Sequence, residues 1–247
     1  MTDMARALTD YSALTFDCYG TLIDWESGIW DALQPLLHRN GCTEITREAG
    51  LVAFAETESA QQAETPDMVY DQLLTRVHAS LAKRFGLKTD DGLDRAFGAS
   101  LPHWPAFPDT ADALRVLKNH FKLVILSNVS REGFAASNRK LGVTFDAIYT
   151  AQDVGSYKPN PGNFTYMLNA LARDHGIAPG DILHTAQSLF HDHVPAKNAG
   201  LDCAWIDRQR LSEGGNWGAT ARVENRPEVD FLYFTMGEMA QAVSDAA

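Results

Sequence analysis

The sequence has few cysteines, no long apolar run and no excess of positive charge. Its three cysteines are an odd number without metal-type spacing, which argues against a disulfide framework and against a zinc site. No apolar run reaches the roughly 18 residues of a membrane span, and the first residues lack the apolar stretch of a signal peptide. These absences predict a cytoplasmic protein that does not span a membrane.

The chain is acidic, with a formal net charge of −11 at pH 7. This acidity argues against non-specific binding to nucleic acid or to an anionic membrane surface. It also means that an anionic substrate needs local positive charge, because the overall field repels it. With 247 residues, 45% of them hydrophobic, the chain can bury a sizeable core, as one large domain or as a core with an inserted second unit.

Short apolar runs alternate with helical patterns, which is typical of a parallel sheet covered by helices. The predicted strands lie at 13–16, 122–126, 147–149, 181–185, 203–206 and, as an edge strand, 231–234. Between the third and fourth predicted strands, apolar residues follow a 3.6-residue period from Phe164 to Leu171. This period predicts a helix, with Gly176 as its expected C-cap. The sequence therefore predicts an α/β fold with a Rossmann-like parallel sheet at its core.

Residues 25–101 show no convincing strand. Their apolar residues follow helical periods instead, at 29–37, at 69–85 and more weakly at 93–101. The proline-rich segment 102–108 is expected to lead the chain back to the sheet. We therefore predict a helical cap domain, 25–101, inserted after the first strand of a core domain formed by 1–24 and 102–247.

Polar residues follow three of the predicted strands. Asp17 comes after the first, Ser127 and Asn128 after the second, and the stretch 187–192 after the fourth. In open α/β sheets ligands bind beyond the carboxyl ends of the strands. One crevice could therefore collect all of these residues, with the helical insert as its lid.

Each of these signals is weak when it is taken alone. An aspartate at a strand end is most often a turn or cap residue, and Lys158 before Pro159 reads most simply as a solvated loop residue. In their order along the chain, however, the four segments 16–22, 126–128, 157–159 and 188–192 resemble the four motifs of the haloacid dehalogenase superfamily. The resemblance covers the chain from about residue 13 to 206.

The first motif narrows the reaction. Phosphatases of that superfamily generally carry Asp-x-Asp, in which the second aspartate protonates the leaving alcohol, but this chain has Tyr19 there. A halide leaves without a proton, and the dehalogenases of the family typically show Asp-x-Tyr-Gly-Thr. A packing aromatic that keeps the turn rigid is the plainer interpretation of Tyr19. Under both interpretations the motif contains no carboxylic proton donor.

The fourth motif points the same way. Magnesium-dependent relatives usually have a carboxylate where this chain has Gln187. Magnesium prefers charged oxygen ligands, so a neutral amide at that place weakens the site. We predict an enzyme without metal or other cofactor.

The resemblance implies two-step nucleophilic catalysis. Asp17 would attack the halogen-bearing carbon and form an ester, which water would then hydrolyse at the carboxyl carbon of Asp17. Lys158 would keep Asp17 ionised and oriented. Asp192 would orient or deprotonate the water, and Thr21 would hydrogen-bond near the nucleophile.

The resemblance also implies where the substrate binds. The backbone amides of Cys18 and Tyr19, together with Ser127, would receive the substrate carboxylate, and Asn128 would donate to the departing halide. His191, at the lip of the crevice, is a further candidate to line the pocket; its spacing from His184 and His193 matches no known two-histidine metal motif.

The chain also departs from the dehalogenase pattern. The (S)-2-haloacid dehalogenases that it resembles place an arginine on an early cap helix, where this chain has Gln61 or Gln62. Gln187 and Leu189 stand where the fourth motif tends to have serine and asparagine, and Phe164 stands in place of a tyrosine. These differences leave unassigned the residue that replaces the expected halide-binding arginine.

The sequence thus predicts a metal-independent hydrolase that removes halide from a small 2-haloalkanoic acid. A magnesium-dependent phosphatase of the same superfamily, an enzyme that opens a strained ring, and a non-catalytic binding protein on the same fold are the alternatives. The presence of Asp17, Lys158 and Asp192 together argues against the last. A homodimer is one open option for the assembly, and halogen preference, chain length and stereochemistry are not predicted.

Overall fold

The computed structural model describes residues 6–246 and contains one six-stranded sheet. All neighbouring strands are parallel, in the order β3-β2-β1-β4-β5-β6. Their bounds are Ala13–Phe16 (β1), Lys122–Ser127 (β2), Ala147–Thr150 (β3), Ile182–Ala186 (β4), Asp202–Ile206 (β5) and Phe231–Tyr233 (β6). The predicted α/β fold is confirmed, and each predicted strand is present with β6 at an edge.

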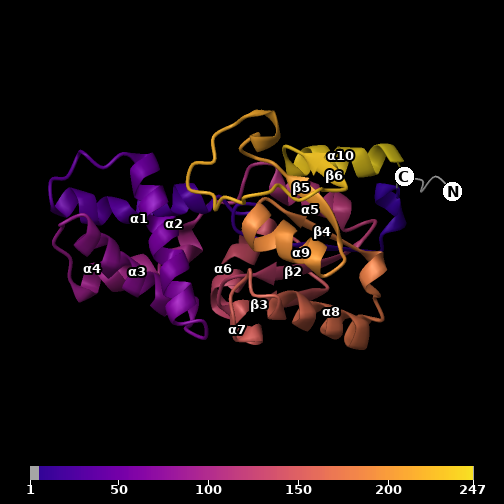
Figure 1. Cartoon of the computed structure of the whole chain (residues 1–247), viewed down its shortest axis with the longest axis horizontal. Helices are drawn as coiled ribbons and strands as arrows, with labels where there is room; N and C mark the ends of the chain where they lie inside the picture. Colours follow the sequence, from indigo (N-terminus) through magenta and orange to yellow (C-terminus); the bar gives the residue numbers. More distant parts are fainter. Residues whose placement is uncertain (1–5, 247) are drawn as a thin grey trace.

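Helices cover both faces of the sheet because its central strands are apolar on both sides. Leu123 and Ile125 of β2 belong to one core cluster with residues of α5 (Thr110–Leu117), α6 (Arg131–Leu141) and α10 (Met236–Ala246). Val124 and Leu126 belong to a second cluster with residues of α8 (Gly162–His175) and α9 (Val194–Asn198). In Figure 1 the helices α10 and α8 accordingly lie on opposite sides of the strands.

Four of the helices between β1 and β2 in the sequence lie together at one end of the molecule (Figure 1). They are α1 (Trp25–Arg39), α2 (Arg47–Glu64), α3 (Tyr70–Arg84) and α4 (Asp91–Gly98). Three of them coincide with the predicted helical periods, whereas α2 was not predicted. Few of its positions are apolar and buried, so its amphipathic pattern is weak. The division into two domains at residues 25 and 101 stays a prediction.

Short helices and one long loop complete the chain. The short helices are η1 (Leu8–Asp10), η2 (Leu101–His103), α7 (Ala151–Val154), η3 (Pro179–Asp181), η4 (Leu189–His193, a π-helix) and η5 (Leu211–Glu213). The loop between η5 and β6 runs towards the four-helix group (Figure 1), where Asn216 donates a hydrogen bond to Glu48 of α2 at 3.3 Å. None of the described helices is long and apolar enough to cross a membrane.

Candidate active site

Asp17 follows the last residue of β1, where the backbone turns sharply. Gly20 has a φ of +98°, in the left-handed region that favours glycine, and a Cβ there would lie 3.1 Å from the side-chain oxygen of Gln187. The turn brings Thr21 back so that its hydroxyl donates to Oδ2 of Asp17 at 2.9 Å. The backbone amide of Gln187 in turn donates to that hydroxyl at 2.9 Å, which fixes Asp17 against the end of β4.

Lys158 is buried, with only 1% of its surface exposed, and all three donors of its ammonium are used. Nζ donates to Oδ1 of Asp17 at 3.0 Å, to Oδ1 of Asp192 at 2.6 Å and to the backbone oxygen of Leu126 at 2.9 Å. Burial lowers the pKa of Lys158, but the two carboxylates outweigh burial and raise that pKa above its ordinary value. The simple interpretation of Lys158 as a solvated loop residue is therefore wrong.

The two carboxylates that share Lys158 differ in proton affinity. Burial raises the pKa of Asp17; the Lys158 ammonium opposes this effect and the Asp192 charge adds to it. Burial also disfavours the charge on Asp192, but Lys158 and a hydrogen bond from His184 outweigh it and hold the pKa of Asp192 below its ordinary value. Asp192 is thus the more firmly ionised of the two.

Asn128 lies beside Lys158 and holds its backbone. Its side-chain amide donates to the carbonyl of Lys158 at 2.9 Å and accepts from the amide of Lys158 at 2.7 Å. One N–H of Asn128 remains for a ligand. Asn128 therefore positions Lys158 and also lines a cavity.

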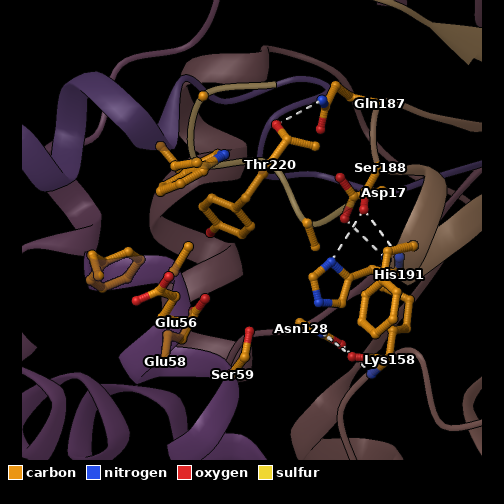
Figure 2. A pocket seen from close by; sticks show the side chains of 18 of the residues that line it. Asp17, Glu56, Glu58, Ser59, Asn128, Lys158, Gln187, Ser188, His191 and Thr220 are labelled. Atoms are coloured by element: carbon orange, nitrogen blue, oxygen red, sulfur yellow. Dashed lines mark hydrogen bonds and ion pairs between the residues drawn. The ribbon is translucent and has the colours of Figure 1, made fainter. Parts of the chain in front are cut away.

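A cavity of about 710 Å³ opens beside Asp17. Six of the nine residues predicted for the site line it, namely Asp17, Tyr19, Asn128, Lys158, His191 and Asp192. Figure 2 shows Asp17, Lys158 and His191 on one side of this cavity. Cys18, Thr21 and Ser127 are buried behind its lining.

The two aromatic candidates have distinct surroundings. Tyr19 shares a hydrogen bond of 2.8 Å with the hydroxyl of Ser137 and packs edge-on against Trp104, so its ring is held in place. Burial raises the pKa of Tyr19 well above its ordinary value. His191 shares a hydrogen bond of 3.2 Å with Ser188, and burial lowers the pKa of His191 to about 4. Both side chains are therefore uncharged at neutral pH.

Helix α2 forms the opposite wall of the cavity (Figure 2). Of the two glutamines considered in place of the expected arginine, Gln62 lines the cavity, whereas Gln61 donates to Thr65 at 3.0 Å. Glu56 and Glu58 also line it, and Glu58 accepts a hydrogen bond from Tyr70. Burial raises the pKa of Glu58 to about 7. Sequence reasoning missed these acidic groups because α2 itself was not predicted.

The loop after η5 forms a third part of the cavity wall. It contributes Asn216, Gly218, Ala219, Thr220, Ala221 and Arg222. The only signal in the sequence is the glycine-rich segment 213–218, which indicates a turn without saying what it contacts. The chain therefore brings three separate segments around the carboxyl ends of β1, β2 and β4.

The residues present do not fit a magnesium site. The side-chain amide of Gln187 donates to Gln209 at 2.7 Å and to Thr220 at 3.2 Å (the latter drawn in Figure 2), and both Asp17 and Asp192 are bound to the Lys158 ammonium. Within residues 6–246, no three histidine, cysteine, aspartate or glutamate side chains gather as a metal site requires. A divalent cation would have to displace Lys158.

Comparison with known proteins identifies the family. The family model of the haloacid dehalogenase-like hydrolases matches residues 11–186. The chain belongs to this hydrolase family. It is similar to (S)-2-haloacid dehalogenase 4A of Burkholderia cepacia, with 26% identity over 202 residues that cover 80% of this chain and 83% of the relative.

Two further comparisons show the breadth of the family. The solved structure of L-2-haloacid dehalogenase from Xanthobacter autotrophicus has 21% identity and a TM-score of 0.77, and the match covers 96% of this chain and all of that one. Phosphoglycolate phosphatase of Photorhabdus laumondii is 23% identical over 225 residues, covering 90% of this chain and 88% of the relative. The chain is thus similar both to dehalogenases and to a phosphatase, and the site must distinguish the two activities.

Proposed function

We propose that this haloacid dehalogenase-like hydrolase removes halide from a 2-haloalkanoic acid through an ester on Asp17. The observation that carries the proposal is the pairing of a buried, Lys158-bound Asp17 with Tyr19 where a proton donor would stand. The 26% identity to an (S)-2-haloacid dehalogenase supports the same activity.

In the first step, an oxygen of the Asp17 carboxylate attacks the carbon that bears the halogen. The new C–O bond forms as the carbon–halogen bond breaks, and the halide leaves with the bonding electron pair. The step needs an ionised Asp17, and the Lys158 ammonium favours that form against the effect of burial. Thr21, through its hydrogen bond to Oδ2, fixes the direction of the attacking carboxylate.

The sheet side of the cavity, beside Asp17, has no acid suited to an alcohol leaving group; Glu58, with a pKa of about 7, lies on the opposite wall (Figure 2). Tyr19 is tethered to Ser137 and its pKa is raised, and His191 is already deprotonated at neutral pH because its pKa is lowered to about 4. Halide needs no proton to depart, whereas the alcohol of a phosphate ester does. This difference favours a dehalogenase over a phosphatase.

The substrate carboxylate needs hydrogen-bond donors beside Asp17. Within residues 6–246 the backbone amides of Cys18 and Tyr19 donate to no protein group, and the buried hydroxyl of Ser127 has no partner. We assign these three donors to the carboxylate. We assign the remaining N–H of Asn128, which lines the cavity, to the halide, and Gln62 on the opposite wall is a second neutral donor.

A single-turnover experiment in ¹⁸O-water tests the covalent mechanism. With excess enzyme and a 2-haloalkanoic acid, the first hydroxy acid should carry light oxygen from Asp17, and the Asp17 peptide should gain the label. Asp17→Ala is the control, which should release no halide. Heavy product with an unlabelled peptide would restrict Asp17 to the role of a base.

A substrate panel tests the reaction class. Halide release from 2-haloalkanoic acids should occur without added metal. Phosphate release from phosphate esters that depends strictly on magnesium would instead favour the phosphatase. If the protein shows neither activity but binds small acids, it is a binding protein on this fold. A cytoplasmic location and a homodimer remain predictions.

A further inference from the structure

His184 lies behind the reacting groups and is completely buried. It is on β4, next to Thr15 of β1 in the register of the sheet. One ring nitrogen, Nδ1, lies 2.9 Å from the hydroxyl of Thr15, and the other, Nε2, lies 3.1 Å from Oδ1 of Asp192. His184 thus links Thr15 of the central strand β1 to Asp192, the carboxylate that shares Lys158 with Asp17.

The surroundings of His184 determine its tautomer. Nε2 faces an ionised carboxylate, which only accepts hydrogen bonds, so Nε2 must carry a proton. The Thr15 hydroxyl has no other partner within residues 6–246 and is buried, so its proton is satisfied only if it donates to Nδ1. This arrangement leaves His184 neutral, as a donor to Asp192 and an acceptor from Thr15.

The other groups that face His184 leave this tautomer undisturbed. The ring of Phe164 packs edge-on at 5.1 Å between centroids, and His193 lies at 6.4 Å. His193 donates to the carbonyl of Ala186 rather than to Asp192, and burial lowers its pKa to about 4. Cys203 is the residue of β5 that pairs with His184 in the sheet, and burial raises the pKa of that thiol to about 12. Lys158 is therefore the one cation that these contacts bring to Asp192.

The hydrogen bonds of Asp192 are unequally divided between its two oxygens. Oδ1 accepts from both Lys158 and His184, whereas Oδ2 has no partner within the described residues although it is buried. A buried carboxylate oxygen without a donor is unusual in a folded protein. Asp192 lines the cavity, and Oδ2 is its one oxygen that still lacks a donor.

We propose that His184 is a positioning residue for the second step: by binding Oδ1 of Asp192, with Thr15 fixing its tautomer, it reserves Oδ2 for the hydrolytic water. This inference rests on the proposed ester mechanism. The water oxygen adds to the carboxyl carbon of Asp17 while one water proton passes to Oδ2. When the tetrahedral adduct collapses, the bond from that carbon to the ester oxygen breaks. The ester oxygen takes the proton from Asp192 and leaves as the hydroxy acid, and Asp17 releases its remaining proton to solvent.

His184→Phe separates the two steps, because it keeps a ring of similar size beside Phe164 and removes the donor to Asp192. Halide should still appear in a burst of one equivalent per enzyme. Hydrolysis should then slow roughly 10- to 100-fold, as expected for the loss of one hydrogen bond to a charged group, so the ester accumulates as a mass gain on the intact protein. His184→Gln, whose amide can donate to Asp192, should recover part of the hydrolytic rate.

His193→Phe is the matched control, since it makes the same change in the same buried cluster away from Asp192. It should not accumulate ester, whatever its effect on the melting temperature. If His184→Phe slows both steps equally, or His193→Phe traps the same ester, His184 has only a structural role and the inference fails. If the wild-type chain releases no halide and forms no ester, the proposed function itself fails.

A measurement on the wild-type protein covers the case in which His184→Phe does not fold. Nitrogen-15 NMR of the histidine rings, assigned by the signal lost in His184→Gln, should show a proton on Nε2 of His184 and none on Nδ1. A proton on Nδ1 would overturn the arrangement. Thr15→Val should weaken this preference and give a smaller accumulation of ester.

Discussion

The two walls of the cavity differ in how completely their charges are compensated. On the sheet side, Asp17, Lys158 and Asp192 bind one another at 3.0 Å or less and are almost fully buried. On the helical side, Glu56 pairs with Arg84 at 2.7 Å, whereas Glu58 forms no ion pair within the described residues and accepts a hydrogen bond from Tyr70. Fixed charges suit the sheet side to bond making, because preorganised groups need little rearrangement during reaction.

The helical side is suited to selecting the substrate. The negative charge of Glu58 opposes an anion. Under the proposed function, the substrate carboxylate therefore lies towards the amides on the sheet side, with its remaining substituent towards α2. Trp25 and Phe54 supply apolar surface there, and a cavity of about 710 Å³ exceeds what the smallest haloacids fill. The contrast predicts large effects from changes on the sheet side and small ones from changes on α2.

The largest effect is expected from Lys158→Met. Turnover should fall by at least about 100- to 1000-fold, because a preorganised charge is lost from the nucleophile. The variant should also be less stable by about 3–5 kcal/mol at neutral pH, since two buried carboxylates lose their shared cation. Halide release and urea denaturation measure the two effects.

The same variant has an internal control in pH. Protonation of the carboxylates removes their repulsion, so the loss of stability should shrink as the pH falls. Unchanged turnover in a folded Lys158→Met protein would show that the reaction does not depend on the positive charge beside Asp17.

The pH profile of kcat/KM should show a displaced acid limb. Asp17 acts only when ionised, and burial is the main cause that raises its pKa above the ordinary value of 3.8. As the pH is lowered, activity should therefore fall with a midpoint above 3.8. Lys158 has a raised pKa and should stay charged on the alkaline side. Initial rates of halide release across the acid range measure the limb. A midpoint at or below 3.8 would contradict the surroundings described for Asp17.

A smaller effect is expected from Glu58→Gln on the helical side. With a pKa of about 7, Glu58 is charged at pH 8 and mostly neutral at pH 6. The substitution should therefore lower KM for a haloacid a few-fold at pH 8, equivalent to roughly 1 kcal/mol of repulsion, and change it little at pH 6. Glu64→Gln is the matched control, on the same helix but outside the cavity lining. Equal effects of both variants would mean that only overall charge matters.

The smallest effect is expected from chelation. Because Gln187 binds Gln209 and Thr220 and both aspartates bind Lys158, halide release should be unchanged by a chelator and by added magnesium. Loss of activity with chelator, restored by magnesium, would show that Lys158 gives way to a cation.

The fold could be predicted largely because its signals are local. Apolar strands alternate with periodic helices, and strand positions such as Leu123 and Ile125 need only their neighbours in sequence to be recognised as buried. Helix α2 escaped prediction because much of its length is polar and its position depends on packing against other helices. With α2 unrecognised, Glu58 and Gln62 could not be placed on a common wall.

The order of the motifs by itself indicated the family and brought Asp17, Lys158 and Asp192 into one prediction, because residues that follow parallel strands meet at the same edge of the sheet. Only the tertiary structure decided that Lys158 is buried between two carboxylates, that Asn128 holds its backbone and that His184 binds Asp192. These contacts join segments distant in sequence. Their strength depends on exclusion of water, which no local pattern of residues specifies.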